Sequence, residues 1–397
     1  MATTILIPIY PLSGPMKKSV PPSTTLTPNC KSSHASYIHL IAPNPYRKLT
    51  FFAVSAASNN QKSISVSVDD HKFEADRPKN DCEELLQTLP RQKNWDGRML
   101  CQYQHSWFPV KYLRGILSAK NNFKAHETDI ILATMPKAGT TWLKALIFSI
   151  VNRHLYNSSL NESPLLSSNS HDLVPFLELD IYRVDENPDL ESIPFPRILA
   201  THVPYRVLPN SIKESGCKII YMCRNPLDQF VSHRHFLLQN RLEPEEEPLS
   251  VDEAFEMYCN GVHPFGPFWD HVLGFWNASL EKPETILFLK YEELKEDIGL
   301  SLKKMAEFMG VPFSADEVKR GGVEEIARLC SIENLRGLKV NKEGNRKGII
   351  KNSLFYRKGG VGDWKNHLSP SMADRIDKLL EGELSGSGLT FKNYIKI

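Results

Sequence analysis

The stretch TDIILATMPKAGTTWLK, residues 128–144, decides the fold of this chain. Its apolar run Asp129–Thr134 predicts a buried strand, and a Pro-Lys-Ala-Gly turn leads from this strand into a predicted helix. A strand that enters a helix through a glycine-containing turn aims backbone N–H groups and the positive end of the helix dipole at one point. Lys137 adds a positive charge beside that point, and Thr140 and Thr141 add hydroxyl donors. The stretch therefore predicts a cradle for a phosphate or sulfate group.

The order of residues in this turn differs from the common P-loop of ATPases and GTPases. In that loop the lysine follows the second glycine, and another glycine opens the loop. Here Lys137 precedes Gly139 and no glycine opens the turn. The turn is therefore predicted to bind an anion without belonging to the P-loop class. Taken alone, the segment also fits an ordinary strand-turn-helix with a solvated lysine.

Composition limits the classes of protein to which the chain can belong. Its 397 residues can form one large domain or two modest ones, and 24% charged with 41% hydrophobic residues is typical of a soluble globular protein. A net charge of +2 gives no indication of nucleic-acid binding, and no apolar run approaches the roughly 20 residues that span a bilayer. The seven scattered cysteines form no Cys-x-x-Cys pair, which favours a reducing compartment over a disulfide scaffold or a zinc site.

The N-terminal segment differs from the rest of the chain. Met1–Val68 contains no Asp or Glu, is rich in Ser, Thr and Pro, and carries scattered Lys and Arg. This composition is typical of organelle transit peptides, although a disordered tail without function has a similar composition. Residues 1–75 are therefore predicted to be a disordered extension, with a plastid transit peptide as one role for it, and residues 81–397 to form the folded domain.

Short apolar runs alternate with longer helical stretches in residues 81–397. The predicted strands are Asp129–Thr134, Arg197–Ala200, Lys218–Cys223 and Thr285–Leu289. The predicted helices are Cys82–Leu89, Lys111–Lys120, Thr141–Arg153, a stretch from Pro226 to Gln239, and Glu292–Met309, with Arg91–Met99 as a connector and Ser158–Ser170 as a loop. This alternation predicts one α/β domain in which helices flank a central parallel sheet.

Four chemically interesting residues each follow a predicted strand. They are Lys137, His202, Arg224 and Tyr291. In parallel sheets ligands bind outside the carboxyl ends of the strands, so the four are predicted to share one site. His202 is a candidate general base, because the ordinary pKa of histidine lies near working pH.

Two further segments carry residues that suit phosphate binding. Arg224 opens a predicted helix in which Ser232 lies two turns later, and arginine suits bidentate phosphate recognition. Near the C-terminus, Arg357–Lys365 (RKGGVGDWK) is a basic, glycine-rich loop whose backbone can approach a phosphate closely. Each segment alone also fits an ordinary capped or solvated structure.

Taken together, these motifs resemble the soluble, cytosolic-type sulfotransferases. The resemblance is closest to the plant branch and its flavonol-type members, and it runs from about Leu86 to the C-terminus. It is carried by PKAGTTWLKAL at 136–146, ATHVPY at 200–205 and CSIENL at 330–335, together with Arg224, Ser232 and the loop Arg357–Lys365.

The resemblance implies a single α/β domain of the nucleotide-kinase-like sulfotransferase fold. It also implies transfer of a sulfuryl group from 3′-phosphoadenosine 5′-phosphosulfate (PAPS) to an acceptor hydroxyl, with His202 as the base and Lys137 stabilising the leaving phosphate. No metal is required. The implied donor-binding residues are Lys137, Ala138, Gly139, Thr140 and Thr141 at the 5′-phosphosulfate, Trp142 and Tyr291 at the adenine, and Arg224, Ser232, Arg357, Lys358 and Gly359 at the 3′-phosphate.

The chain departs from the animal members of this family at three places. Ala200 stands where they often carry a lysine, and Ile332 stands where an aromatic residue usually flanks the adenine. The dimer motif is echoed only in part between Lys365 and Asp374, which favours a monomer or a weak dimer. The family implies a cytoplasmic protein, or a plastid stromal one if residues 1–68 act as a transit peptide, with no nucleic-acid or membrane partner.

The acceptor is predicted to be a small and flat or apolar metabolite. Three aromatic segments, Tyr103–Phe108, Phe176–Tyr182 and His263–Trp269, are expected to build its pocket. Flavonoid, brassinosteroid, jasmonate-type and glucosinolate-precursor acceptors all fit this description. Two other functions remain open at this point: a kinase or NTPase that uses the same turn for ATP, and a non-catalytic protein that only binds PAPS or its product 3′-phosphoadenosine 5′-phosphate (PAP).

Overall fold

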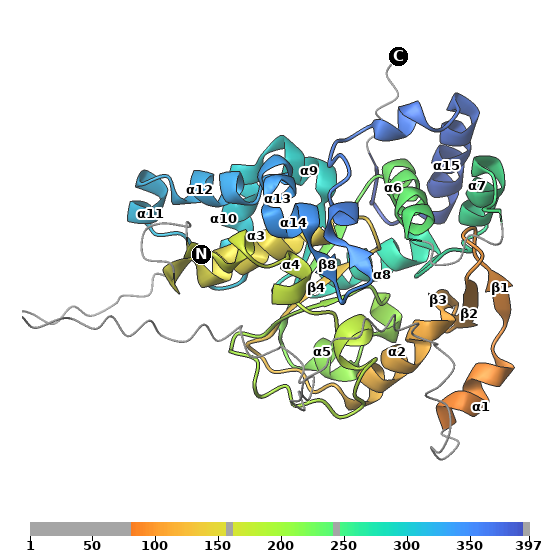
Figure 1. The fold of residues 1–397 in the computed structure, drawn as a ribbon, viewed down its shortest axis with the longest axis horizontal. Coiled ribbons are helices and arrows are strands. Elements are labelled where there is room, and N and C mark those ends of the chain that lie inside the picture. Colours follow the sequence, from red (N-terminus) through yellow and green to blue (C-terminus); the bar gives the residue numbers. More distant parts are fainter. Residues whose placement is uncertain (1–80, 156–161, 241–246, 392–397) are drawn as a thin grey trace, which may run out of the picture. The chain divides into compact units, whose positions relative to one another are not determined.

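Four buried strands form a parallel sheet at the centre of the computed structural model (Figure 1). They are β4 (Ile130–Thr134), β5 (Ile198–Thr201), β6 (Lys218–Cys223) and β7 (Ile286–Lys290), in the order β5-β4-β6-β7. Almost every residue of β4, β5 and β6 is buried, because helices cover both faces of such a sheet. The predicted parallel sheet flanked by helices is confirmed, with strand bounds within two residues of those expected.

The structure describes residues 81–155, 162–240 and 247–391. The predictions for residues 1–75, and for the first residues of the loop 158–170, lie outside the described residues. Within that loop, residues 164–166 form a short 3₁₀ turn, and the helix α4 (Ser170–Leu173) begins at its last residue.

The strand order opens a crevice between β4 and β6. From β4 the chain continues to β5 on one side, whereas from β6 it continues to β7 on the other side. Where neighbouring parallel strands send their connections in opposite directions, a crevice forms at their carboxyl ends. Lys137 lies in the connection that follows β4, and Arg224 directly follows β6. The topology therefore brings these two cations to the same crevice.

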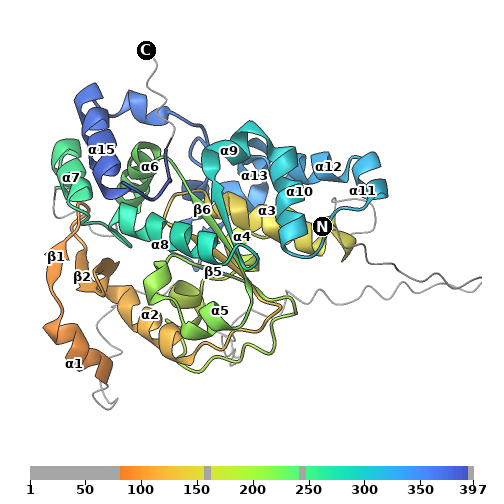
Figure 2. The same ribbon diagram turned by 180° about the vertical axis from the view of Figure 1, so that it is seen from behind.

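Alternating side chains of the sheet face two different layers of helices. Ile131 and Tyr221 belong to the main core with α2 (Val110–Asn122) and α8 (Phe268–Glu281), and the Tyr221 ring stacks on the ring of Phe275 at 4.2 Å. Helix α3 (Thr140–Asn152) packs against β4, and α10 (Ile298–Phe308) and α12 (Gly322–Leu329) pack on α3. Figures 1 and 2 show this second group of helices gathered around α3, away from α2.

The remaining helices and two small sheets complete the described residues. The helices are α1 (Asp81–Thr88), α5 (Asn210–Glu214), α6 (Pro226–Gln239), α7 (Val251–Cys259), α9 (Tyr291–Glu296), α10 (Ile298–Phe308), α11 (Ala315–Lys319), α12 (Gly322–Leu329), α13 (Ile332–Gly337), α14 (Lys339–Glu343) and α15 (Pro370–Glu383). Two small antiparallel sheets consist of β1 (Arg91–Lys93), β2 (Met99–Tyr103) and β3 (Ser106–Pro109), and of β8 (Asn345–Arg346) and β9 (Ile350–Lys351).

Two expectations about secondary structure are wrong. The helix expected over Glu292–Met309 is two helices, α9 and α10, that meet at Asp297. Asp297 has non-helical backbone angles, with φ of −140° and ψ of 88°. Its carboxylate accepts a hydrogen bond from Leu300 N at 2.9 Å, so it caps a new helix. The expected connector Arg91–Met99 includes the strand β1 and the first residue of β2.

The hairpin between β2 and β3 has a turn that local sequence rules do not predict. Tyr103 pairs with Ser106, and the two residues between them, Gln104 and His105, have φ of 47° and 61°. Such two-residue turns need positive φ at both positions, and they are usually signalled by Asn-Gly or Asp-Gly. Gln-His carries no such signal, so tertiary packing must hold this turn.

Candidate functional site

The turn between β4 and α3 has the backbone of an anion-binding loop. Lys137 and Gly139 both adopt left-handed conformations, with φ of 66° and 106°. A Cβ atom on Gly139 would lie 2.7 Å from the Tyr291 ring, so only glycine fits there. The first N–H groups of α3, at Thr140 and Thr141, have no partner within the helix, and both residues line a cavity. Strained backbone at a non-glycine residue such as Lys137 is typical of ligand sites.

The ammonium group of Lys137 lies among apolar rings and other cations. Its Nζ atom is 4.3 Å from the centroid of the Phe236 ring and 3.5 Å from the carbonyl oxygen of Leu354. Burial lowers the pKa of Lys137 to about 7, and the charges of Arg224 and Arg357 act in the same direction. The residue as a whole is half-buried, so the ammonium is its desolvated end. An anion bound among these three cations would stabilise the charged form of Lys137.

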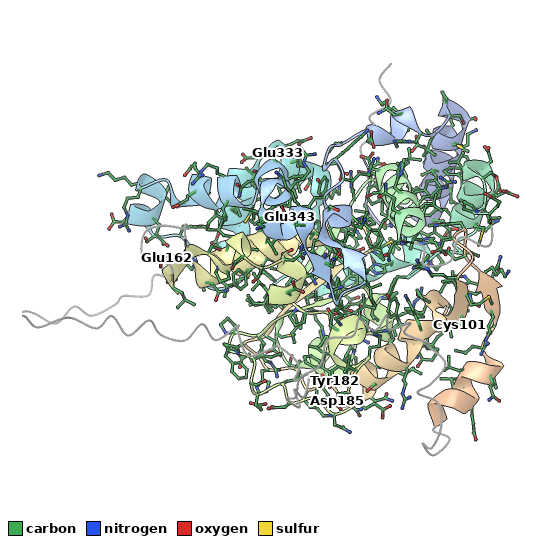
Figure 3. All side chains as sticks on the ribbon, in the orientation of Figure 1. Cys101, Glu162, Tyr182, Asp185, Glu333 and Glu343 are labelled. Carbon is green, nitrogen blue, oxygen red and sulfur yellow. The ribbon has the colours of Figure 1, made fainter. Side chains whose placement is uncertain are left out.

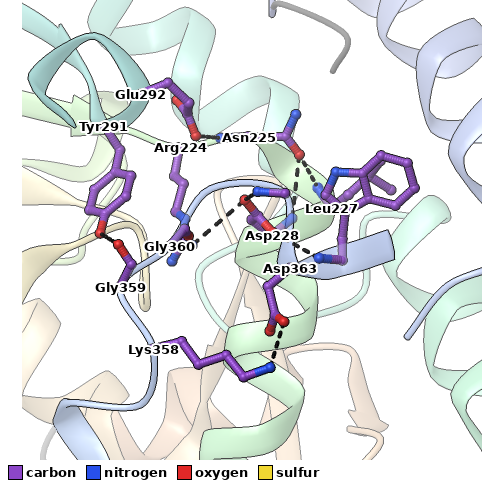
Figure 4. A network of polar contacts seen from close by, with 12 residues as sticks. Arg224, Asn225, Leu227, Asp228, Tyr291, Glu292, Lys358, Gly359, Gly360 and Asp363 are labelled. Carbon is purple, nitrogen blue, oxygen red and sulfur yellow. Dashed lines mark hydrogen bonds and ion pairs between the residues drawn. The ribbon is translucent and has the colours of Figure 1, made fainter. Parts of the chain in front are cut away.

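A second group of polar contacts joins the end of β6 to the loop Arg357–Gly362 (Figure 4). Arg224 donates from Nη2 to the carbonyl oxygen of Gly360 at 2.6 Å, and the hydroxyl of Tyr291 donates to the carbonyl oxygen of Gly359 at 2.7 Å. Arg224 is 5% exposed, and its Nε atom has no hydrogen-bond partner among the described residues. A buried guanidinium with an unused donor is a strong site for a phosphate oxygen.

The cations of this loop are held by one carboxylate. Asp363 accepts from Arg357 at 2.5 Å and from Lys358 at 2.7 Å. Burial raises the pKa of Asp363, but these hydrogen bonds outweigh it and hold the pKa below its ordinary value. Both cations and Ser232 of α6 line the same cavity as Arg224. The arrangement is a preformed cluster of positive charge, built by other segments than the Lys137 turn.

Aromatic and apolar side chains line the cavity together with the two cationic groups. The rings of Trp142 and Tyr291 meet edge to face, with centroids 5.4 Å apart. Arg224 lies over the other part of this wall, with Cζ 4.6 Å from the Tyr291 centroid. Ile332 lines the cavity beside Gly359, where a Cβ on that glycine would approach Ile332 to 2.8 Å. A planar heterocycle fits a wall of this kind.

His202 directly follows β5, and a backbone hydrogen bond fixes its tautomer. Its Nδ1 atom lies 2.7 Å from the carbonyl oxygen of Thr134, which can only accept. Nδ1 therefore carries the proton, and Nε2 is unprotonated. The side chain is 8% exposed and lines the cavity, and burial lowers the pKa of His202 to about 3. At neutral pH the imidazole is neutral and can accept a proton from a hydroxyl group in the cavity.

A hydrogen-bonded chain behind His202 fixes its backbone. His271 donates from Nε2 to the carbonyl oxygen of His202 at 2.9 Å, and the hydroxyl of Tyr221 donates to Nδ1 of His271 at 2.9 Å. On the other side the N–H of His202 donates to Oε1 of Glu178 at 2.8 Å. The Phe176 ring, at 4.5 Å, packs against the imidazole. Such support keeps a reactive side chain within the narrow geometry that chemistry needs.

Buried histidines make the fold sensitive to acid, which can be tested. Burial lowers the pKa of His202 and of His263 to about 3 and that of His271 to about 4, whereas burial raises the pKa of Glu178 to about 7. Below pH 6.5 the unfolded chain protonates its histidines first and the folded chain does not, so stability falls as pH falls. Glu178 has the opposite effect, because its raised pKa makes the folded chain bind one proton before the unfolded chain does. Burial lowers the pKa of His171 and His233 as well. With these five histidines and Glu178, we expect a net loss of roughly 4 to 5 kcal/mol of unfolding free energy per pH unit between pH 6.5 and 4.5, measured by denaturant unfolding.

The variant His263→Phe serves as the control for this pH dependence. His263 stacks on Trp95 and Tyr258, and a phenyl ring keeps these contacts while removing one titrating group. We expect the slope to decrease by about 1.4 kcal/mol per pH unit, whatever the variant's absolute stability. An unchanged slope would contradict the assignment of acid sensitivity to the buried histidines.

One cavity, with about 1350 Å³ of space including its open mouth, brings nearly all predicted site residues together. The predicted residues that line it are Lys137, Gly139, Thr140, Thr141, Trp142, His202, Arg224, Ser232, Tyr291, Arg357, Lys358 and Gly359. Ala138 is the exception. Its methyl group is buried in the main core and its N–H donates to the carbonyl oxygen of Met135 at 3.1 Å, so the turn points this residue away from the cavity.

The segments expected to build the other half of the cavity contribute only in part. Phe176 and Leu179, and Pro264 and Phe265, line it as expected. The expectation for Tyr103–Phe108 is wrong, since no residue of this segment is among the lining residues and Leu100, Pro109 and Tyr112 take its place. The reason is the pairing of the hairpin, which turns Phe108 toward the core. Tyr182, labelled in Figure 3, also lies in the core, where its ring meets Phe123.

A family model described as a sulfotransferase domain matches residues 127–388. The chain belongs to the sulfotransferase family. Among its relatives, cytosolic sulfotransferase 15 of Arabidopsis thaliana is 43% identical over 85% of this chain and 99% of its own length. Cytosolic sulfotransferase 5 of the same plant is 45% identical over 77% of this chain and 95% of its own length. The resemblance found in the motifs is thereby confirmed, including the plant branch.

Solved structures confirm the fold of this sulfotransferase. The structure of a candidate steroid sulphotransferase of Arabidopsis thaliana is 38% identical, covers 83% of this chain and 100% of that chain, and has a TM-score of 0.64. A mouse sulfotransferase complexed with PAP is 29% identical, covers 72% of this chain and 95% of that chain, and has a TM-score of 0.57.

Sequence reasoning missed a buried network behind the Lys137 turn of the sulfotransferase. Lys144 of α3 is 0% exposed and donates to the carbonyl oxygen of Val174 at 2.7 Å and to Nδ1 of His171 at 3.1 Å. Nε2 of His171 lies 3.0 Å from the hydroxyl of Thr141, so the network orients that hydroxyl toward the cavity. Burial, followed by the charge of Arg346, lowers the pKa of Lys144 well below its ordinary value. A lysine inside an otherwise apolar helix was the signal that could have found it.

Two features are absent from the described residues of the sulfotransferase: a membrane-spanning helix and a metal-binding cluster. Within 81–155, 162–240 and 247–391, no helix has the length and apolar character needed to cross a membrane. In the same ranges, no group of three or more His, Cys, Asp or Glu residues is arranged to hold a metal ion.

Proposed function

We propose that this protein transfers the sulfuryl group of PAPS to a hydroxyl group of a small metabolite. The observation that carries the proposal is the cavity, in which two separate cationic groups and an unprotonated imidazole nitrogen face the same space. The two groups match the two phosphate-bearing ends of PAPS, and the aromatic wall of the cavity matches its adenine. The relative from mouse was crystallised with PAP, the product of such a transfer.

The donor site in this proposal has three parts. The Lys137 turn, with the N–H groups and hydroxyls of Thr140 and Thr141, binds the 5′-phosphosulfate. Trp142 and Tyr291 contact the adenine. The residues at the 3′-phosphate are Arg224, Ser232, Arg357, Lys358 and the backbone of Gly359.

His202 acts as general base in the proposed reaction. Its Nε2 atom takes the proton of the acceptor hydroxyl while the hydroxyl oxygen attacks sulfur in line with the leaving group. A new O–S bond forms, the bond from sulfur to the bridging oxygen of the 5′-phosphate breaks, and PAP leaves with the electron pair. Lys137 and the N–H groups of its turn stabilise the charge on that oxygen, so catalysis is positioning and electrostatics.

The acceptor half of the cavity has an apolar wall. Phe176, Phe236, Leu237, Phe265 and Phe355 line it. This favours an acceptor with an aromatic or apolar ring system, of flavonoid, steroid or hormone type, whose reacting hydroxyl reaches His202.

A binding competition and an acceptor screen test the proposal together. PAP is expected to displace a fluorescent adenine nucleotide at concentrations far below those at which ATP displaces it. With PAPS present, a panel of flavonoids, steroids and hydroxylated hormones is expected to yield at least one product heavier by a sulfuryl group in mass spectrometry. Tighter binding of ATP would favour a kinase or NTPase, and PAP binding without any product would favour a non-catalytic binding protein.

Binding of PAP is expected to take up a proton. Lys137 has a pKa of about 7 in the nucleotide-free protein, so it is mostly neutral at pH 8. A bound phosphate raises that pKa, hence close to one proton enters on binding at pH 8 and affinity decreases as pH rises above 7. Calorimetric titration in HEPES and in Tris, which differ in ionisation enthalpy, counts the protons. Lys137→Met should abolish the uptake, and a wild-type uptake of zero would contradict the assignment.

Assignments outside the site are also part of the proposal. Residues 81–397 form the sulfotransferase domain as a monomer or weak dimer, which sedimentation velocity checks. The compartment is the cytoplasm, as in the names of the relatives, or the plastid stroma if residues 1–68 act as a transit peptide. A fluorescent protein fused to Met1–Val68 decides between the two by its location in leaf cells.

A further inference from the structure

We propose that Asp228 is a positioning residue that presets the clamp for the 3′-phosphate of the nucleotide. The clamp consists of Arg224 and the loop Arg357–Gly362, which come from distant parts of the sequence. Asp228 is not among the residues that line the cavity, so it acts through these groups rather than on the ligand. The inference rests on the proposed function, because it assigns a task within the proposed PAPS site.

Both carboxylate oxygens of Asp228 hold the backbone that follows the loop. Oδ2 accepts from the N–H of Gly362 at 2.7 Å, and Oδ1 accepts from the N–H of Trp364 at 3.0 Å (Figure 4). These two N–H groups lie at the start of the 3₁₀ turn Asp363–Asn366. The capping residue of this turn is Gly362, which has φ of 82° and no side chain that could accept a hydrogen bond. A carboxylate from α6 therefore supplies the cap that the turn lacks.

Fixing these two amides also fixes the cations of the loop. Asp363 lies between Gly362 and Trp364, and its carboxylate binds Arg357 and Lys358. Residues 357–362 form neither helix nor strand, so the position of these cations depends on side-chain contacts: those of Asp363, and those of Tyr291 and Arg224 with the loop backbone. The connection runs from Asp228 through the backbone to Asp363 and from there to both cations.

The same carboxylate orients the other arm of the clamp. Oδ2 of Asp228 lies 3.7 Å from Nη2 of Arg224, and that nitrogen donates to the carbonyl oxygen of Gly360. The side chain of Asn225 accepts from the N–H of Asp228 at 3.3 Å and so fixes the start of α6 (Figure 4). Asp228 is 1% exposed, and its carboxylate position is set by the two backbone N–H groups and Arg224.

Electrostatics separates this geometric role from a simple charge effect. A carboxylate beside a phosphate site repels the phosphate, so removing its charge alone should strengthen nucleotide binding. Its presence 3.7 Å from Arg224 is therefore explained by the geometry that it enforces. We expect geometry to dominate, because removing the carboxylate leaves a buried N–H without its acceptor.

The experiment compares two nucleotides on the full-length chain by isothermal titration. PAP carries the 3′-phosphate and adenosine 5′-phosphate (AMP) lacks it, so the ratio of their dissociation constants reports the clamp alone. In D228N we expect PAP to bind about 10- to 100-fold more weakly, with less than a threefold change for AMP. In D228E the charge is kept but displaced by one methylene, and we expect the same loss of preference for PAP.

The matched control is D270N. Asp270 occupies the same position in α8 as Asp228 does in α6, and it pairs with Arg206 at 2.5 Å on the surface. It is not among the residues lining the cavity, so neither nucleotide should bind differently. The control corrects for the loss of an acidic residue and an ion pair in the first turn of a helix.

Each outcome decides between the two proposals. If the wild type does not prefer PAP over AMP, the proposed donor site fails and the inference with it. If the wild type prefers PAP and D228N keeps that preference, the inference alone is overturned. It is equally overturned if D228N loses both nucleotides to the same extent, or if D228E retains the wild-type ratio. If D228N does not fold, as judged by its thermal melt, the D228E ratio decides.

Discussion

Replacement of His202 by asparagine is expected to lower kcat for sulfuryl transfer by about 10²- to 10⁴-fold, the usual contribution of a general base. The amide nitrogen of asparagine takes the place of Nδ1 and can still donate to the carbonyl oxygen of Thr134, so the local structure is kept. No atom replaces Nε2, and the proton of the acceptor hydroxyl then has no acceptor. The decrease in kcat is measured as product formation with PAPS, followed by mass spectrometry.

The matched control for this prediction is His233→Asn. His233 is also buried, also lines the cavity, and burial lowers its pKa well below the ordinary value. We expect it to change KM for the acceptor and to leave kcat within about threefold. Both variants should bind PAP as the wild type does. Full turnover in His202→Asn would show that another group takes the proton.

Replacement of Lys137 by methionine is expected to lower kcat by about 10²- to 10³-fold or more, because the charge on the leaving oxygen loses its closest cation. The same change should raise the melting temperature of the nucleotide-free protein. Burial and the neighbouring arginines disfavour the charged ammonium, as its lowered pKa indicates, and a methionine removes that cost. Stabilisation by PAP should decrease at the same time, since part of the binding energy came from Lys137.

Lys295→Met is the control for Lys137→Met. The ammonium of Lys295 lies 5.5 Å from the centroid of Trp142, beside the proposed adenine site, but Lys295 is exposed and not among the cavity residues. We expect kcat, melting temperature and PAP stabilisation within the range of the wild type. A drop in nucleotide-free stability of Lys137→Met below that of this control would contradict the argument that Lys137 costs the fold free energy for the sake of the site.

The sequence predicted the parts of the site that local rules determine. Lys137, His202, Arg224 and Tyr291 each lie directly after or in the turn after a strand, and a parallel sheet brings such positions to one edge. This one geometric rule predicts that the four separate motifs line the same cavity. The loop Arg357–Gly362 was found through its composition, since glycine and basic residues together suit a phosphate.

The parts that sequence reasoning missed depend on tertiary contacts. One missed group consists of His171, Lys144 and Arg346. These residues come from three different segments and come together only in the folded chain, so no sequence spacing predicts the group. Tyr103–Phe108 was misplaced because aromatic composition does not tell which face of a hairpin meets the core. The motif alone does not show that Ala138 turns away from the cavity, because the direction of its methyl group depends on the backbone conformation of the turn.

The two halves of the cavity differ in the kind of structure that builds them. The proposed donor half is made mainly of residues in the turns and helices that directly follow β4, β6 and β7, together with the loop residues Arg357, Lys358 and Gly359. The turn Asn94–Arg98, the loop at Pro264–Phe265 and the hairpin β8–β9 also line the cavity, on the proposed acceptor side, and they lie outside the parallel sheet. An engineer could therefore exchange these segments for those of another sulfotransferase, redirecting the enzyme to a different metabolite while the nucleotide machinery stays intact.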